Sequence, residues 1–117
     1  MQEQSNRALR VAELIRRELT NLLRSEVKDP RVADVIIYDV VVSNDLSLAK
    51  VYYSPMDIQQ DATEMQQGLD SARGYLRTQL GKVLTLRRAP ELRFIVDETE
   101  VNSQRIEQLI QRSQNKS

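Results

Sequence analysis

Apolar positions in the first quarter of the chain recur with the spacing of an α-helix. From about residue 6 to Ser25 the apolar side chains lie three or four positions apart, and charged residues fill the intervals. Ser5 or Asn6 can cap the start of this helix. The segment 28–31, Lys-Asp-Pro-Arg, ends it, because the residue before a proline avoids the helical region. The predicted apolar face comprises Ala8, Val11, Ala12, Ile15, Leu19, Leu22 and Leu23.

Two later stretches alternate with a period of two, as β-strands do. The first predicted strand covers residues 35–43, and its apolar face comprises Ile36, Tyr38, Val40 and Val42. The second covers residues 48–54, with an inward face of Ala49, Val51 and Tyr53. Asn44 and Asp45 between them are a turn pair, so the two strands form a hairpin, and we assign this turn no chemistry.

A second helical pattern begins near Ala62 and continues to Val83, with apolar residues at steps of three or four. Gly74 lies in its middle, and a glycine inside a helix costs about 1 kcal/mol relative to alanine. The sequence Ala72-Arg73-Gly74 therefore predicts a bend, or a break into two helices. We expect Ala72 and Gly74 to be structural residues that allow a close approach of backbone at this bend.

The last quarter of the chain predicts one more strand and one more helix. Residues 91–97 alternate as a third strand, and residues 97–100 resemble the acidic first turn of a short helix. Residues 111–117 are polar and predict a disordered tail, which leaves one domain at residues 1–110. The order of elements predicts an α+β fold in which helices cover one apolar face of a three-stranded sheet.

Composition narrows the possible chemistry. The 117 residues include neither cysteine nor histidine, which excludes disulfides, thiolate metal sites and the commonest general base. No apolar run approaches the roughly 20 residues of a membrane helix, and the first ten residues are unlike a signal peptide. No phosphate-loop motif is present. We expect a soluble, cytoplasmic domain that is not an enzyme and uses no cofactor.

Charge is balanced over the whole chain but unevenly distributed along it. The chain has 17 basic and 17 acidic residues. Residues 31–70 hold two basic and seven acidic residues, a net charge of −5, whereas residues 73–93 hold six basic and one acidic, a net charge of +5. Because an anion responds to the local field, this pattern predicts a basic, nucleic-acid-binding surface. Its candidate residues are Arg73, Arg77, Lys82, Arg87 and Arg88.

Each of these charges also has a simpler interpretation. The basic segment could be only a solvated helix face followed by a loop. Lys28 and Arg31 lie at an exposed corner and are further candidate RNA contacts. In the simpler interpretation, residues 28–31 form only the turn that stops the helix. Arg7 and Arg10 are candidates as well, but Glu13 can neutralise Arg10 within the helix.

Three carboxylates near the end of the chain are candidate metal ligands. Asp97, Glu98 and Glu100 are close in sequence, yet carboxylates at a helix start more often interact with its dipole. No calcium-loop pattern accompanies them. We therefore expect no metal site.

Five segments, in order along the chain, match the pattern of a known family. They are Arg10-Val11, residues 28–31, residues 42–52 (Val-Ser-Asn-Asp-Leu-Ser-Leu-Ala-Lys-Val-Tyr), residues 86–94 (Leu-Arg-Arg-Ala-Pro-Glu-Leu-Arg-Phe) and Asp97. The block 42–52 is the most specific. Together they span about residues 7–110 and resemble the ribosome-binding factor A family, small bacterial assembly factors of the small ribosomal subunit.

The resemblance implies a fold and a function. The fold is a type II KH-like domain in which Ala72-Arg73-Gly74 replace the Gly-x-x-Gly loop of other KH domains. The implied function is to bind the free 30S subunit and assist late processing of 16S rRNA near its 5′-terminal helix, with a role in cold adaptation. A ribosome-associated GTPase is the implied partner for release.

Within that framework we expect a monomer that binds RNA through phosphates and shape. The backbone N–H groups at the amino end of the second half-helix, near Gly74, would take a phosphate. One phenylalanine and four tyrosines are too few for a stacking platform. Two other functions stay open: a dormancy factor on mature ribosomes, and a protein-interaction module without an RNA role. The complete set of candidate RNA-binding residues is Arg73, Arg77, Lys82, Arg87, Arg88, Lys28, Arg31 and Arg10.

Overall fold

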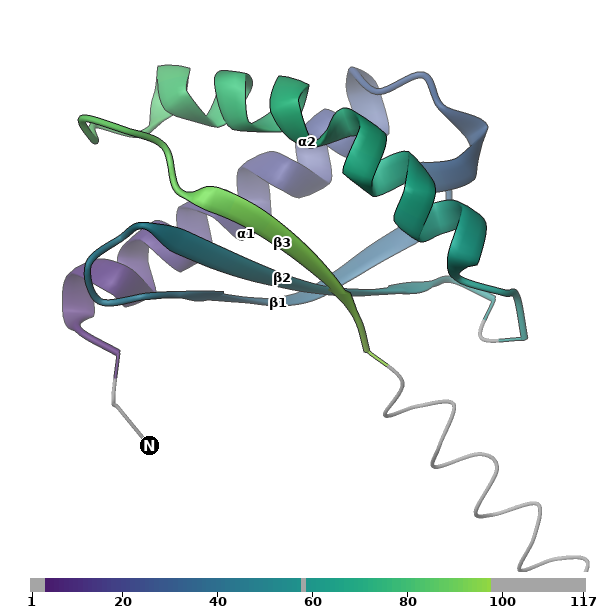
Figure 1. Cartoon of the computed structure of the whole chain (residues 1–117), viewed down its shortest axis with the longest axis horizontal. Coiled ribbons are helices and arrows are strands. Elements are labelled where there is room, and N and C mark those ends of the chain that lie inside the picture. The colour runs from purple at the N-terminus through teal and green to yellow at the C-terminus, as the bar shows by residue number, and fades with distance from the viewer. Residues whose placement is uncertain (1–3, 58, 98–117) are drawn as a thin grey trace, which may run out of the picture.

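Two helices lie on one side of a three-stranded sheet in the computed structural model, which describes residues 4–57 and 59–97 (Figure 1). This arrangement confirms the predicted α+β architecture. The predicted last helix and tail, and Glu98 and Glu100 of the acidic group, lie outside the described residues. The elements are α1 (Asn6–Ser25), the 3₁₀ turn η1 (Pro30–Val32), β1 (Val35–Val42), β2 (Leu48–Pro55), α2 (Thr63–Val83) and β3 (Glu91–Val96).

Helix α1 begins where its cap predicts. The Ser5 side chain accepts a hydrogen bond from the Ala8 backbone N–H at 3.1 Å, so Ser5 rather than Asn6 is the capping residue. The predicted apolar face is confirmed, because five of its members are buried against the sheet: Ala8, Ala12, Ile15, Leu19 and Leu23. After the helix, the Asp29 carboxylate caps η1 by accepting from the Arg31 N–H.

Strand β2 is the central strand of the sheet. It pairs antiparallel with β1 through the predicted hairpin and parallel with β3, in the order β1-β2-β3. Helix α2 makes the connection between the two parallel strands, which cannot be joined by a tight turn. The parallel register places Leu48 beside Glu91 and Tyr53 beside Val96.

The predicted apolar face of β1 is wrong in its first half. A bulge at Tyr38 shifts the register, so that Ile37 pairs with Tyr53 and Asp39 pairs with Tyr52. Because one extra residue reverses the alternation, Val35 and Ile37 pack against the core whereas Tyr38 is exposed. Val40 and Val42 lie beyond the bulge and point inward as expected.

Helix α2 is continuous, so the predicted break into two helices is wrong. Its axis nevertheless bends near the middle, as Figure 1 shows. The Thr78 hydroxyl donates to the Gly74 carbonyl at 3.0 Å, a contact that commonly bends helices. The expected close backbone approach at Gly74 is also wrong, since a Cβ there would meet nothing within 4 Å.

The close approach lies earlier on the same helix, at Gly68. A Cβ at Gly68 would lie 2.8 Å from the Val32 Cγ1 and 3.0 Å from the Arg31 Cβ. This buried glycine therefore allows α2 to cross η1. Four large apolar side chains of α2, Met65, Leu69, Leu76 and Leu80, are buried in the core between the helices and the sheet.

None of the helices among the described residues is both long and apolar enough to span a membrane.

Candidate nucleic-acid interface

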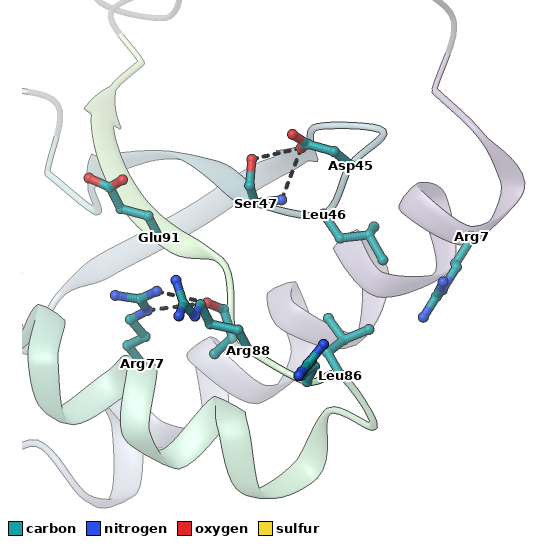
Figure 2. Close-up of a pocket in the computed structure, with 10 residues that line it drawn as sticks. Arg7, Asp45, Leu46, Ser47, Arg77, Leu86, Arg88 and Glu91 are labelled. Carbon is teal, nitrogen blue, oxygen red and sulfur yellow. Dashed lines mark hydrogen bonds between the residues drawn. The ribbon is translucent and has the colours of Figure 1, made fainter.

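A cleft of about 480 Å³ lies at the end of the sheet where β2 and β3 begin (Figure 2). Five segments contribute to it: the start of α1, the β1–β2 turn, the second half of α2, the loop between α2 and β3, and the first residue of β3. In Figure 2 Arg7 extends from α1, while Arg77 and Arg88 lie near Glu91. The lining residues are Arg7, Asp45, Leu46, Ser47, Arg77, Leu86, Arg87, Arg88, Ala89 and Glu91.

Arg77 is held in place by the loop that it faces. Its Nε and Nη2 donate to the Ala89 carbonyl oxygen at 3.2 and 3.0 Å. A guanidinium has five N–H donors in a fixed plane, so this attachment orients Arg77 and leaves donors for a ligand. The Glu91 N–H donates to the Ser47 carbonyl at 2.9 Å and fastens the same loop to the hairpin turn.

The loop between α2 and β3 carries two further arginines in addition to Arg77 on the helix. Arg87 and Arg88 are exposed, and Pro90, which follows them, is buried. The buried proline anchors the end of the loop, while the two guanidinium groups remain accessible to solvent. The structure therefore brings three members of the predicted basic segment, Arg77, Arg87 and Arg88, into the lining of one cleft.

The hairpin turn forms the other wall of the cleft. The Asp45 carboxylate accepts hydrogen bonds from the Ser43 hydroxyl at 2.6 Å, the Ser47 hydroxyl at 2.7 Å and the Ser47 N–H at 3.1 Å. These bonds favour the ionised form and lower the pKa of Asp45 to about 2. Leu46 has φ 62°, a left-handed conformation that is uncommon for a bulky side chain, and this side chain lines the cleft.

We predict that the two serines control the titration of Asp45. The double variant Ser43→Ala/Ser47→Ala removes both hydroxyl donors, so the pKa of Asp45 should rise from about 2 toward its ordinary value of 3.8. Carboxyl-carbon NMR titration measures both values. Because the folded-state pKa is below the unfolded one, the wild-type stabilisation is full above pH 3.8 and is lost as the pH falls toward 2. An unchanged pKa in the variant would contradict this assignment.

The cleft is cationic on balance, since four arginines and two carboxylates line it. The carboxylates Asp45 and Glu91 come from the turn and from the start of β3, whereas the arginines come from α1, α2 and the α2–β3 loop. Leu46 and Leu86 add apolar surface. Such a site fits a phosphate-bearing ligand that also presents flat apolar groups, as a nucleotide does.

The other predicted RNA contacts lie outside this lining. Arg31 forms an ion pair with Asp29 at 2.7 Å, and the Arg31 guanidinium lowers the pKa of that carboxyl. Arg73 is 3.8 Å from Asp70, one turn earlier on the same helix. Arg31 thus packs beside α2 with its charge compensated, and Arg73 is partly compensated. The remaining three candidates, Arg10, Lys28 and Lys82, are exposed and separate from the cleft.

The predicted phosphate site at the backbone of Gly74 is wrong. It required free N–H groups at the start of a second half-helix. Because α2 runs unbroken from Thr63 to Val83, its interior N–H groups bond to carbonyls one turn earlier. The backbone N–H groups around Ala72, Arg73 and Gly74 are therefore not the free donors of a helix start.

The sequence analysis missed the hairpin turn as part of the site. Asn44 and Asp45 were assigned only a turn, and Leu46, Ser47 and Leu86 were not considered. A helical connection between β2 and β3 predicts parallel pairing, and parallel strands begin at the same edge of a sheet. Applied to the sequence, that rule predicts that the segments preceding β2 and β3 lie at the same edge of the sheet.

Comparison with known proteins identifies close relatives. A family model described as Ribosome-binding factor A matches residues 7–110. The Ribosome-binding factor A of Vesicomyosocius okutanii is 50% identical over 110 residues, which are 93% of this chain and 95% of that protein.

Solved structures share the fold. The crystal structure of ribosome-binding factor A from Thermus thermophilus has a TM-score of 0.68 at 22% identity, and covers 76% of this chain and 94% of that one. A homology model of the Thermus thermophilus protein, fitted into the cryo-EM map of its complex with 30S, has a TM-score of 0.61 at 23% identity, and covers 74% of this chain and 90% of that one. These likenesses confirm the type II KH-like α+β fold that the resemblance implies.

Proposed function

This chain belongs to the ribosome-binding factor A family, and from that premise we propose that it binds the free 30S subunit and assists late maturation of 16S rRNA without catalysing a reaction. The observation that carries the proposal is the cleft that is lined by Arg7, Arg77, Arg87 and Arg88. Arginine suits phosphate recognition because its planar donors match phosphate oxygens in pairs. The ribosomal context is supported by the Thermus relative, which is described in a complex with 30S.

The arginines would act by holding one conformation of the RNA. Arg77 is oriented by the Ala89 carbonyl before any ligand arrives, so less freedom is lost when it binds a phosphate. A protein that binds one of two RNA folds more tightly shifts the population toward that fold. We place this action near the 5′-terminal helix of 16S rRNA. A role in cold adaptation follows, because alternative RNA pairings persist longer at low temperature.

The remaining features of the function come from the family resemblance. The chain acts as a monomer in the cytoplasm, and a ribosome-associated GTPase releases it from the subunit. Release requires only that the phosphate contacts be weakened, and a partner that changes the RNA conformation does this without touching the cleft.

Sucrose-gradient fractionation of cell extracts tests the assignment. We expect the protein to sediment with free 30S subunits, because an assembly factor leaves before the subunits join. Sedimentation with 70S or dimeric ribosomes would instead indicate a dormancy factor, and absence from all ribosomal fractions would indicate a protein-interaction module. Extracts prepared from cold-grown cells should show a larger bound fraction than extracts from warm-grown cells.

A further inference from the structure

The sheet has one face that no described element covers. Helices α1 and α2 both lie on the opposite side (Figure 1). Residues whose side chains alternate with the buried positions point to this open face. Buried Ala49, Val51 and Tyr53 of the central strand point toward the helices, so Lys50 and Tyr52 point away from them.

The strand register arranges the open face into two rows. Lys50 pairs with Val41 on one side and with Arg93 on the other, which forms a row with two cations. Tyr52 pairs with Asp39 and with Ile95 in the next row, two residues along each strand. The two rows are about 7 Å apart at the strand rise of roughly 3.3 Å per residue.

The bulge of β1 adds a second aromatic ring to the latter row. Because the extra residue at Tyr38 leaves both it and Asp39 opposite Tyr52, Tyr38 lies on the open face beside Tyr52. Tyr38 is 44% exposed, and Tyr52 is half-buried. The sequence expectation that the aromatic residues are too few for stacking overlooked this pairing, which depends on the bulge.

The cations of the neighbouring row are unpaired within the described part of the chain. The side chains of Lys50 and Arg93 form no ion pair or hydrogen bond with another residue of the ranges 4–57 and 59–97. Arg31, by contrast, is neutralised by a carboxylate. Two unpaired cations beside two aromatic rings match the chemistry of single-stranded RNA, whose phosphates are anionic and whose bases stack on aromatic side chains.

We propose that the open face of the sheet is a second RNA-binding surface that takes two or three unpaired nucleotides. Bases stack on Tyr38 and Tyr52, and phosphates contact Lys50 and Arg93. This surface is separate from the arginine cleft, and only the ribosomal source of its RNA rests on the proposed function. It lets the protein hold an unpaired rRNA segment while the cleft holds phosphates at the end of the sheet.

Fluorescence anisotropy with a labelled, unstructured RNA octamer tests this surface in the full chain. Tyr38→Ala should weaken binding about tenfold, because one stacked base is lost. Tyr38→Phe keeps the ring and should stay within about twofold of wild type. Tyr75→Ala is the matched control, since Tyr75 is equally exposed at 44% but lies on α2.

A charge variant provides an independent readout of the same surface. Lys50→Gln/Arg93→Gln should flatten the plot of log affinity against log salt for the octamer by up to about 1.4, the slope of two single-strand phosphate contacts. The inference is overturned if Tyr38→Ala and the charge variant bind the octamer as wild type does. It is also overturned if they bind the octamer normally but lose the 30S subunit, which would assign the face to a protein. Neither result affects the cleft, whose own variants are tested against the subunit.

Discussion

Replacing Gly68 by alanine should lower the free energy of unfolding by about 1 to 3 kcal/mol, although alanine is the better helix former. The new Cβ would lie 2.8 Å from the Val32 Cγ1 and 3.0 Å from the Arg31 Cβ, distances that force α2 away from η1. Val32 is buried and β-branched, so it cannot turn aside as a flexible side chain would. Chemical denaturation monitored by circular dichroism measures the loss.

Gly74→Ala is the matched control on the same helix. A Cβ at Gly74 meets nothing within 4 Å, so this substitution should raise the free energy of unfolding by about 0.5 to 1 kcal/mol through helix propensity alone. Equal effects at the two positions would contradict the assignment of the close approach to Gly68.

Reversing two charges in the cleft should have the largest effect on binding. Arg87→Glu/Arg88→Glu replaces two accessible cations by anions at the site where we place the RNA phosphates. Each lost charged hydrogen bond costs about 1.5 kcal/mol or more, so two should weaken 30S binding roughly a hundredfold. Filter binding to purified subunits measures the change. The fold should be unaffected, because both arginines are exposed.

Arg17→Glu/Arg24→Glu makes the same change in net charge on α1, at two exposed arginines outside the cleft lining. This control variant should lose far less affinity, because only the long-range attraction to RNA is reduced. If both double variants weaken binding equally, net charge and not the cleft determines the affinity.

Much of the fold follows from local patterns in the sequence. The Ser5 cap, the apolar spacing of α1 and the turn pair Asn44-Asp45 are each determined by neighbouring residues. The misjudged features depend on contacts between distant segments. The bulge at Tyr38 depends on how β1 pairs with β2. The close approach at Gly68 depends on how η1 packs against α2.

The candidate site was predictable in part for the same reason. Arg77, Arg87 and Arg88 were identified because their charges lie close together along the chain. The carboxylate neighbours of Arg31 and Arg73 lie only two and three residues earlier in the chain, so the spacing argument that linked Glu13 to Arg10 also applied to them but was not used. Asp45 and Ser47 were missed because they join the arginines only through the parallel register of β2 and β3.

The salt dependence of binding to the 30S subunit tests the central claim most directly. If the arginine cleft binds rRNA phosphates, log affinity should fall linearly with log salt, and the slope for Arg87→Glu/Arg88→Glu should be flatter than that of wild type by about 2 or less. Binding that does not depend on salt, or a slope that the double variant leaves unchanged, would contradict it.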